Sequence, residues 1–261
     1  SLVLRAHDGA QHRTIRVWTY KPANWQAGGD VLFVMHGMSR NAEEYLDTWV
    51  ETADSKSMLL IAPEFDNPFY RYVTNDYQDG NLFSALGFAN PPSEWAYAAI
   101  ERIVDHLNAA NGWSITGYDM FGHSAGGQFV QKMAMLAPKS RMRTGIAANA
   151  GSYTFPDREI AFPYGLKGVD AAAIDLARSF GRNVIILLGE KDDDANQGVL
   201  DESQPAMRQG PHRLARGQNL FETARTTAAA HGLRFEWRLK IVPGVGHENQ
   251  KMAAAAADLL Q

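Results

Sequence analysis

The stretch Gly122-His123-Ser124-Ala125-Gly126 decides how the rest of the chain is interpreted. A short apolar run at 118–121 precedes it and a segment of helical periodicity at 127–134 follows it, which predicts a strand, a tight turn and a helix. A Gly-x-Ser-x-Gly turn in this setting is typical of a nucleophile elbow. Side chains at positions 122 and 126 would crowd the turn, so glycine is expected there. The alternative is a glycine-rich turn that carries an ordinary serine.

The composition is that of an ordinary α/β chain with a sizeable core. It has 261 residues, 45% of them hydrophobic, and a net charge of −4. The charges are dispersed, so no nucleic-acid partner is expected, and no apolar run approaches the roughly 18 residues of a transmembrane helix. The chain has no cysteine, which excludes disulfides, thiolate metal sites and a cysteine nucleophile. It begins with Ser1, and export to the periplasm or medium after removal of a signal peptide is one expectation.

Apolar strands and helical patterns alternate along the chain and predict a doubly wound, mostly parallel sheet of about eight strands with helices on both faces. Strands are expected at 14–20, 31–35, 58–62, 118–121, 143–150, 183–189 and 235–242. Helices are expected at 42–53, 93–111, 125–138, 169–180 and 220–231, and after His247. Pro63 is expected to end its strand and Ser93 to cap the following helix. One domain over 1–261 is predicted, with loop insertions at about 63–92, 152–167 and 191–217.

The insertion at 63–92 is long and rich in aromatic residues, which is typical of a lid or a functional loop. A surface excursion packed by its own aromatic rings is the alternative. We expect aromatic side chains of the first two insertions to line a substrate cleft, where they suit phenolic groups or sugar rings, although they suit plain packing too. These residues are Phe65, Phe69, Tyr70, Tyr72, Tyr77, Tyr153 and Phe155.

Polar residues follow the predicted strands where a doubly wound sheet binds its ligands. Ser124 needs a base, and His247, in the glycine-rich turn after the last strand, can reach back to it. An acid must hold that imidazole in the right tautomer, and Asp192 follows the strand that ends near Gly189. The backbone N–H of Ala125 and that of Met38, with Gly37 as the next choice, are the expected oxyanion donors.

Each of these residues has a structural alternative. His247 could lie on a wet surface at a helix start, and His36 is expected to brace its loop rather than to act as a base. Asp193 and Asp194 compete with Asp192, and the three carboxylates together could bind Ca²⁺ or be solvated. The order of serine, acid and histidine along the chain favours a catalytic triad. No metal and no cofactor are expected.

The sequence resembles the α/β-hydrolase superfamily, and within it the group of poly(3-hydroxybutyrate) depolymerases and feruloyl esterases, including the LpqC-type depolymerases of bacteria. The resemblance rests on three motifs: His36-Gly37, the segment 122–127, and Ala148-Asn149-Ala150-Gly151-Ser152. It implies an α/β-hydrolase fold, hydrolysis of carboxylic esters, no cofactor and, in many members, export. Two departures are the lack of cysteines and the lack of a tryptophan after His247.

We therefore expect a serine esterase with a Ser124–His247–Asp192 triad, acting through an acyl-enzyme intermediate. A polymer, an oligomer and a small soluble ester remain alternative substrates. A peptidase on the same scaffold ranks lower, because the sequence marks no acidic pocket for an amine. A non-catalytic binding protein of this fold is the alternative from another class. The sequence fixes no oligomeric state.

Overall fold

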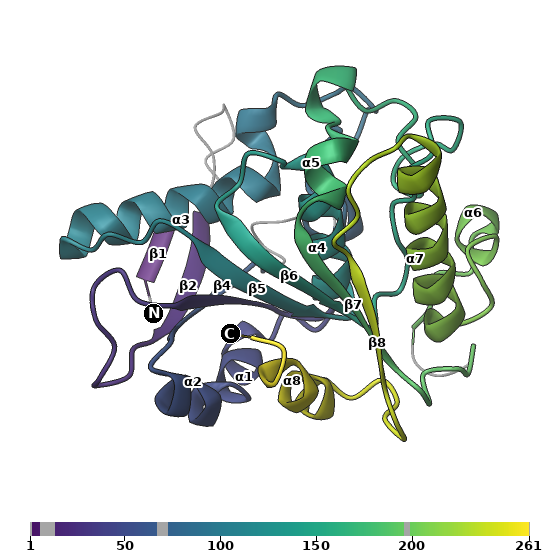
Figure 1. The fold of residues 1–261 in the computed structure, drawn as a ribbon. Helices are drawn as coiled ribbons and strands as arrows, with labels where there is room; N and C mark the ends of the chain where they lie inside the picture. Colours follow the sequence, from purple (N-terminus) through teal and green to yellow (C-terminus); the bar gives the residue numbers. More distant parts are fainter. Residues whose placement is uncertain (1, 6–13, 67–72, 196–198, 261) are drawn as a thin grey trace. The chain divides into compact units, whose positions relative to one another are not determined.

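The computed structural model describes residues 2–5, 14–66, 73–195 and 199–260. The chain divides into two compact units. Unit 1 comprises Ser1–Met120 and Lys139–Arg143, and unit 2 comprises Phe121–Pro138 and Thr144–Gln261. The described residues form eight strands, and the predicted mostly parallel α/β sheet is confirmed (Figure 1). The prediction of a single domain stays a prediction.

Unit 1 holds the antiparallel edge of the sheet. β1 (Leu2–Arg5) pairs antiparallel with β2 (Thr14–Tyr20), and β2 pairs antiparallel with β4 (Leu59–Glu64). β3 (Val31–Met35), which is fully buried, pairs parallel with β4. Burial alternates along the first residues of β2, as its alternating sequence predicts. The continuous apolar run of β3 is buried on both faces, as expected for a central strand.

The helices of unit 1 cover its strands from two sides. α1 (Ala42–Asp47) and α2 (Val50–Lys56) lie on one side and α3 (Ala96–Asn111) lies on the other (Figure 1). Two short helical turns, η1 (Val73–Gln78) and η2 (Pro92–Glu94), belong to the predicted insertion at 63–92. The last strand of this part, β5 (Tyr118–His123), begins in unit 1 and ends in unit 2.

Unit 2 carries three parallel strands in the order β6 (Met142–Ala148), whose first two residues belong to unit 1, β7 (Asn183–Gly189) and β8 (Arg238–Val242). The helices α4 (Ala125–Leu136) and α7 (Arg213–Ala230) lie on one face of these strands, and α8 (Asn249–Ala257) lies on the other (Figure 1). The short helices η3 (Ala171–Ala173), α5 (Leu176–Phe180) and α6 (Gln204–Met207) complete the unit. Every residue of α4 is buried, which suits a helix at the centre of the unit.

Several predicted boundaries are wrong. The helix expected at 42–53 is two helices, and Pro63 lies inside β4 opposite Val17, because a strand tolerates proline where its missing N–H is not needed. Trp95, not Ser93, precedes α3, since Pro92 starts a separate turn. α7 begins at Arg213 rather than near residue 220, capped by His212, whose Nδ1 accepts from the N–H of Ala215.

The predicted helix at 169–180 is likewise reduced to η3 and α5, and the strand expected from residue 235 begins at Arg238. No described helix is long and apolar enough to cross a membrane.

Candidate active site

Ser124 occupies the sharp turn between β5 and α4. Its φ of 59° and ψ of −117° lie outside the regions that a serine ordinarily adopts, as expected at a nucleophile elbow. The turn is held by the Ser124 N–H, which donates to the Ala148 carbonyl over 2.9 Å. The prediction that a side chain at position 122 would crowd the turn is confirmed, because a Cβ there would lie 2.2 Å from the Gly126 carbonyl oxygen. Gly127 is also required, since its Cβ would lie 2.6 Å from the Ala148 oxygen.

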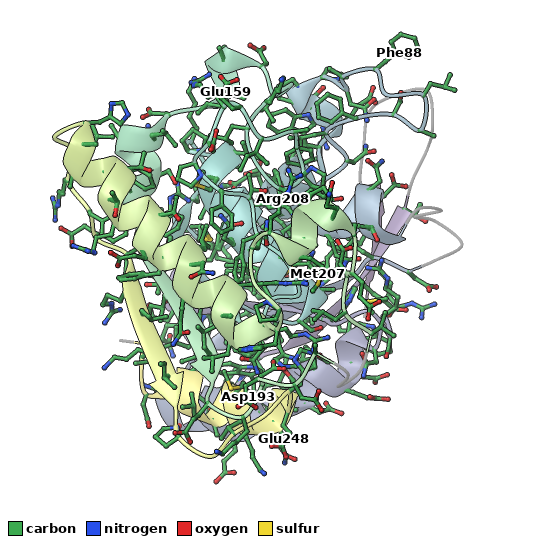
Figure 2. The ribbon with its side chains drawn as sticks, turned by 90° about the vertical axis from the view of Figure 1, so that its right-hand side faces the viewer. Phe88, Glu159, Asp193, Met207, Arg208 and Glu248 are labelled. Carbon is green, nitrogen blue, oxygen red and sulfur yellow. The ribbon has the colours of Figure 1, made fainter. Side chains whose placement is uncertain are left out.

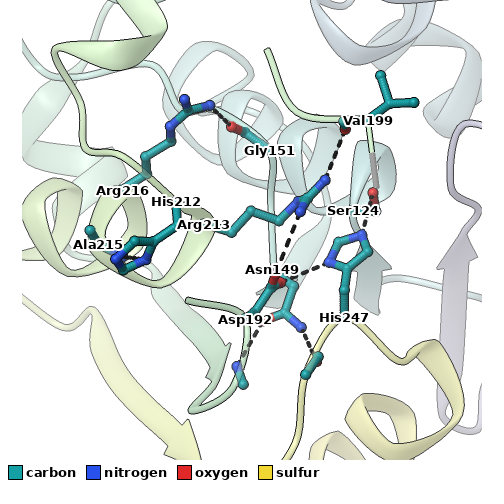
Figure 3. Close-up of polar contacts among 12 residues, drawn as sticks. Ser124, Asn149, Gly151, Asp192, Val199, His212, Arg213, Ala215, Arg216 and His247 are labelled. Carbon is teal, nitrogen blue, oxygen red and sulfur yellow. Dashed lines mark hydrogen bonds and ion pairs between the residues drawn. The ribbon is translucent and has the colours of Figure 1, made fainter. Parts of the chain in front are cut away.

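The structure brings together the three side chains that the sequence predicted to act together. His247 Nε2 lies 3.0 Å from the Ser124 hydroxyl oxygen, and His247 Nδ1 lies 2.7 Å from Asp192 Oδ2 (Figure 3). The carboxylate can only accept, so Nδ1 carries the proton and Nε2 is left to accept from the serine hydroxyl. Asp192 is buried, whereas Ser124 and His247 are partly exposed. The arrangement can transfer the Ser124 proton to His247 while a substrate approaches from solvent.

The turn that carries His247 is held against the end of β7. The Lys191 N–H donates to the Val245 carbonyl over 2.7 Å, and the Glu190 N–H donates to the Val242 carbonyl. Gly189 is needed at this crossing, because a Cβ there would lie 2.5 Å from the Val245 oxygen. The histidine turn and the loop that carries Asp192 are therefore fixed to each other by backbone hydrogen bonds.

Asn149 connects three segments of the site, although the sequence predicts no role for its side chain. Its side-chain Nδ2 donates to the Gly246 carbonyl over 2.9 Å, and its Oδ1 accepts from the Gly189 N–H over 2.7 Å (Figure 3). Its φ is 45°, a region that asparagine adopts more readily than most residues. A buried polar residue directly after a buried strand was the signal that could have identified it.

Asp192 is distinguished from its two acidic neighbours by burial. Its side chain is 1% exposed, whereas Asp193 (Figure 2) and Asp194 are exposed. The Asp192 carbonyl accepts from the N–H of Leu214 at the start of α7. Its carboxylate also lies 3.5 Å from the guanidinium of Arg213. Among the described residues, no group of three or more acidic or histidine side chains is arranged to hold a metal ion.

His123, at the variable position of the elbow, packs against His247 with ring centroids 4.5 Å apart. It is 2% exposed. Burial, and after it the nearby His247 and Arg213, hold the pKa of His123 well below its usual range. His123 is therefore neutral at ordinary pH, which suits a packing surface for the His247 ring. The sequence likewise predicts no chemical role for His123.

The segment after β6 is clamped by glutamine side chains. Gln128 donates to the Ser152 hydroxyl, Gln131 exchanges two hydrogen bonds with the backbone of Thr154, and Gln209 exchanges two with that of Tyr153. Tyr153 is fully buried and Phe155 is 9% exposed. In this structure, therefore, Tyr153 offers no surface to a substrate, and Phe155 offers little.

The remaining predicted cleft residues belong to unit 1. Tyr70, Phe69 and Tyr72 lie outside the described residues. Phe65 and Tyr77 are fully buried and stack with ring centroids 4.8 Å apart, so here the insertion is packed by its own aromatic rings. The Tyr77 hydroxyl donates to the His36 carbonyl over 2.8 Å. These two rings support the loop after β3 instead of lining a surface.

The loop after β3 is braced by His36, as the sequence predicted. His36 Nδ1 donates to the Gly37 carbonyl and Nε2 accepts from the Phe65 N–H, so the ring is neutral. Met38, the predicted second oxyanion donor, lies in this loop and is 45% exposed. Ala125, the first predicted donor, begins α4, where helix geometry gives its N–H no acceptor four residues earlier. Both assignments stay predictions.

The burial of His36 predicts a loss of stability in acid. Burial, and after it the Arg40 charge, lower the pKa of His36 to about 3. The unfolded chain binds a proton near pH 6.5 and the folded chain does not, so the free energy of unfolding falls as the pH falls from about 6.5 towards 3, by up to about 1.4 kcal/mol per pH unit. We expect the free energy of unfolding of His36→Gln to fall less steeply with pH, because the variant takes up about one proton fewer on unfolding. Urea unfolding at pH 7, 6, 5 and 4 measures this slope. The exposed His106, changed to Gln, is the control that keeps the wild-type slope; an unchanged slope in His36→Gln would contradict the prediction.

The serine lies on a strained strand-to-helix turn and is hydrogen-bonded to a histidine, which an acid holds in turn. This arrangement, on a mostly parallel α/β sheet, is typical of the α/β hydrolases. Comparison with solved structures agrees. The chain is 35% identical to poly(aspartic acid) hydrolase-1 from Sphingomonas sp. KT-1, with a TM-score of 0.92 over 99% of this chain and 96% of that one. It is 36% identical to LpqC, a poly(3-hydroxybutyrate) depolymerase from Bordetella parapertussis, with a TM-score of 0.88 over 95% of this chain and 85% of that one.

A more distant similarity shows the fold alone. S-formylglutathione hydrolase FrmB from Staphylococcus aureus is 13% identical, with a TM-score of 0.60 over 99% of this chain and 96% of that one. No protein-family model and no curated protein sequence matches the chain. The identity and coverage of the first two structures are decisive: the chain belongs to the α/β-hydrolase superfamily. The predicted fold and the predicted resemblance to the depolymerase group are confirmed.

Proposed function

We propose that this protein is a serine hydrolase that cleaves carboxylic esters through an acyl-enzyme intermediate. The observation that supports the proposal is the hydrogen-bonded chain from Ser124 through His247 to the buried Asp192. Serine is a weak nucleophile at its ordinary pKa, and a neutral imidazole 3.0 Å away is the base that it needs. Asp192 fixes the tautomer of that imidazole and stabilises the imidazolium that forms.

In the first half of the reaction, Ser124 Oγ attacks the ester carbonyl carbon while its proton moves to His247 Nε2. The negative charge that develops on the carbonyl oxygen is stabilised by the N–H of Ala125 and, as the sequence predicts, by that of Met38. The tetrahedral intermediate collapses with cleavage of the C–O bond. His247 gives its proton to the departing alkoxide, which leaves as an alcohol, and Ser124 holds the acyl group.

In the second half, a water molecule takes the place of the alcohol. His247 Nε2 accepts one of its protons as the water oxygen attacks the acyl carbon. The second tetrahedral intermediate breaks the bond to Ser124, whose oxygen regains a proton from His247. The products are the alcohol and the carboxylic acid, and the enzyme returns to its starting state.

The comparisons favour two classes of substrate. LpqC is named a poly(3-hydroxybutyrate) depolymerase, which indicates an oligomeric or polymeric ester. Poly(aspartic acid) hydrolase-1 is named for a polymer whose backbone consists of amide bonds. An amide needs a protonated leaving group more than an ester does, and the same histidine supplies that proton. We therefore put ester hydrolysis first and hydrolysis of an acidic polyamide second.

Hydrolysis of a substrate panel tests this proposal. The panel contains p-nitrophenyl acetate, butyrate and octanoate, methyl ferulate, a 3-hydroxybutyrate oligomer and an aspartate oligomer. We expect turnover of esters, with the hydroxybutyrate oligomer cleaved faster than simple esters if the depolymerase-like specificity holds. Cleavage of the aspartate oligomer above all esters would favour the second candidate. Ser124→Ala is the control in which each activity is lost.

Labelling by a fluorophosphonate separates an enzyme from a binding protein of the same fold. We expect the wild type to label rapidly and Ser124→Ala not to label. A folded wild type that neither labels nor hydrolyses any member of the panel would contradict the proposal and favour a non-catalytic binding protein.

A further inference from the structure

Asp192 is bound from two directions, and the second direction is not part of the proposed triad. One carboxylate oxygen, Oδ2, lies 2.7 Å from His247 Nδ1, while the other, Oδ1, lies 3.5 Å from Arg213 Nη1 (Figure 3). The side chains of Arg213 and Asp192 are 3% and 1% exposed, so the pair is shielded from solvent. A shielded ion pair holds its geometry more firmly than an exposed one, because water does not compete for either charge.

Arg213 also holds the chain at Val199. Its Nη2 donates to the Val199 carbonyl over 2.8 Å (Figure 3). The backbone beside it acts in the same sense, because the Leu214 N–H donates to the Asp192 carbonyl over 3.1 Å. The start of α7 therefore holds Asp192 twice, at its main-chain carbonyl through Leu214 and at its carboxylate through Arg213.

The position of Arg213 on its helix is electrostatically unfavourable in isolation. It is the first residue of α7, and a cation at a helix N-terminus is repelled by the helix dipole. Burial adds a desolvation cost that only a well-placed partner offsets. The partner here is the proposed triad acid, which indicates that the ion pair with Asp192 offsets the cost of placing an arginine at this position.

We propose that Arg213 is a positioning residue of the active site, which holds Asp192 in the orientation that His247 requires. This inference rests on the proposed function. With both carboxylate oxygens occupied, one by Arg213 and one by His247, the carboxylate cannot rotate away from the imidazole without losing a charge-assisted hydrogen bond. Arg213 does not touch the reacting atoms, so its loss acts on kcat through Asp192 and leaves substrate binding largely unchanged.

Arg216 offers a matched control on the same helix. It is also fully buried, and its guanidinium donates to the carbonyls of Gly151, Asp201 and Gly210. No hydrogen bond or ion pair between Arg216 and Asp192 is found among the described residues. Loss of Arg216 therefore removes a buried cation from the same helix without removing a partner of the Asp192 carboxylate.

A double-mutant cycle with Asp192→Asn tests the proposal, with kcat and KM measured on the best ester of the panel. We expect Arg213→Gln to lower kcat about 10- to 100-fold with KM changed less than about 3-fold, and Arg213→Lys to restore part of that loss. In the Asp192→Asn background, Arg213→Gln should lower kcat less than about 2-fold. Arg216→Gln should instead lower kcat by the same factor in both backgrounds, since it does not act through Asp192.

If Arg213→Gln alone does not fold, Asp192→Asn can still be compared with the double variant Asp192→Asn/Arg213→Gln. The double variant has no carboxylate at position 192, so no buried charge is left without its partner. An equal effect of Arg213→Gln in both backgrounds would overturn the Arg213 assignment alone. An Asp192→Asn enzyme with full activity would overturn the triad of the proposed function, and this assignment with it.

Discussion

Replacing Ser124 by alanine is expected to lower kcat/KM for ester hydrolysis by about 10⁴- to 10⁶-fold. The alanine keeps the helix and the N–H of Ala125 but removes the hydroxyl oxygen that we propose forms the acyl-enzyme, so the remaining rate would come from substrate binding and oxyanion stabilisation. The wild-type hydroxyl lies 3.0 Å from His247 Nε2, and no other described serine is hydrogen-bonded to this histidine. The measurement is kcat/KM on the best substrate of the panel, with fluorophosphonate used to count the active sites of the wild type and to detect any wild-type enzyme in the variant.

Ser179→Ala is the matched control for this experiment. Ser179 is fully buried in α5, and its hydroxyl contacts the sulfur of Met135 rather than any triad residue. The same change there is expected to cost about 1 kcal/mol of stability or less and to leave kcat/KM within about 2-fold of the wild type. If Ser124→Ala retained more than about 1% of wild-type activity in a preparation free of wild-type enzyme, Ser124 would not be the nucleophile.

Replacing Asp192 by asparagine is expected to lower kcat by about 10³- to 10⁴-fold. Two donors, His247 Nδ1–H and the Arg213 guanidinium, face the two carboxylate oxygens. An amide has one oxygen and one NH₂ group, so one of these donors would meet another donor. If that donor is on His247, the imidazole turns to the wrong tautomer and Nε2 can no longer accept the serine proton. Steady-state kinetics, with urea unfolding to confirm the fold, measure the effect.

Asp193→Asn tests whether the neighbouring carboxylate could serve instead. Asp193 is exposed and makes no hydrogen bond to His247 among the described residues, so its loss should change kcat less than about 2-fold. A greater loss in Asp193→Asn than in Asp192→Asn would show that the acid has been assigned to the wrong residue.

The features that could be predicted from the sequence are those encoded by neighbouring residues. The elbow is one, because the glycine at 122 and the serine at 124 meet their steric constraint within a few residues of the chain. The buried strands β3 and β7 are another, since a continuous apolar run is typical of a strand covered on both faces. Helix boundaries were less accurate, because capping at Trp95 and His212 depends on turns that the periodicity does not contain.

The part of the site that could not be predicted depends on contacts between distant residues. Arg213 meets Asp192 across 21 residues, and Asn149 meets the Gly246 carbonyl across 97. Neither residue belongs to a motif whose local spacing requires a polar partner. The aromatic residues show that residue type alone does not predict exposure. Tyr77 and Tyr153 are of a type common in substrate clefts, but they are fully buried in this structure.

The sequence by itself determined the α/β architecture, the nucleophile elbow and the order of serine, acid and histidine along the chain. Sterics and hydrophobic periodicity act over a few residues, and the printed sequence contains them in full. Only the tertiary structure decided which of three adjacent carboxylates is buried against His247, and which arginine and asparagine hold the segments of Asp192 and His247 in place. Those choices follow from the free energy of burying a charge or a polar group, which depends on whether a partner from another part of the chain is within hydrogen-bond distance.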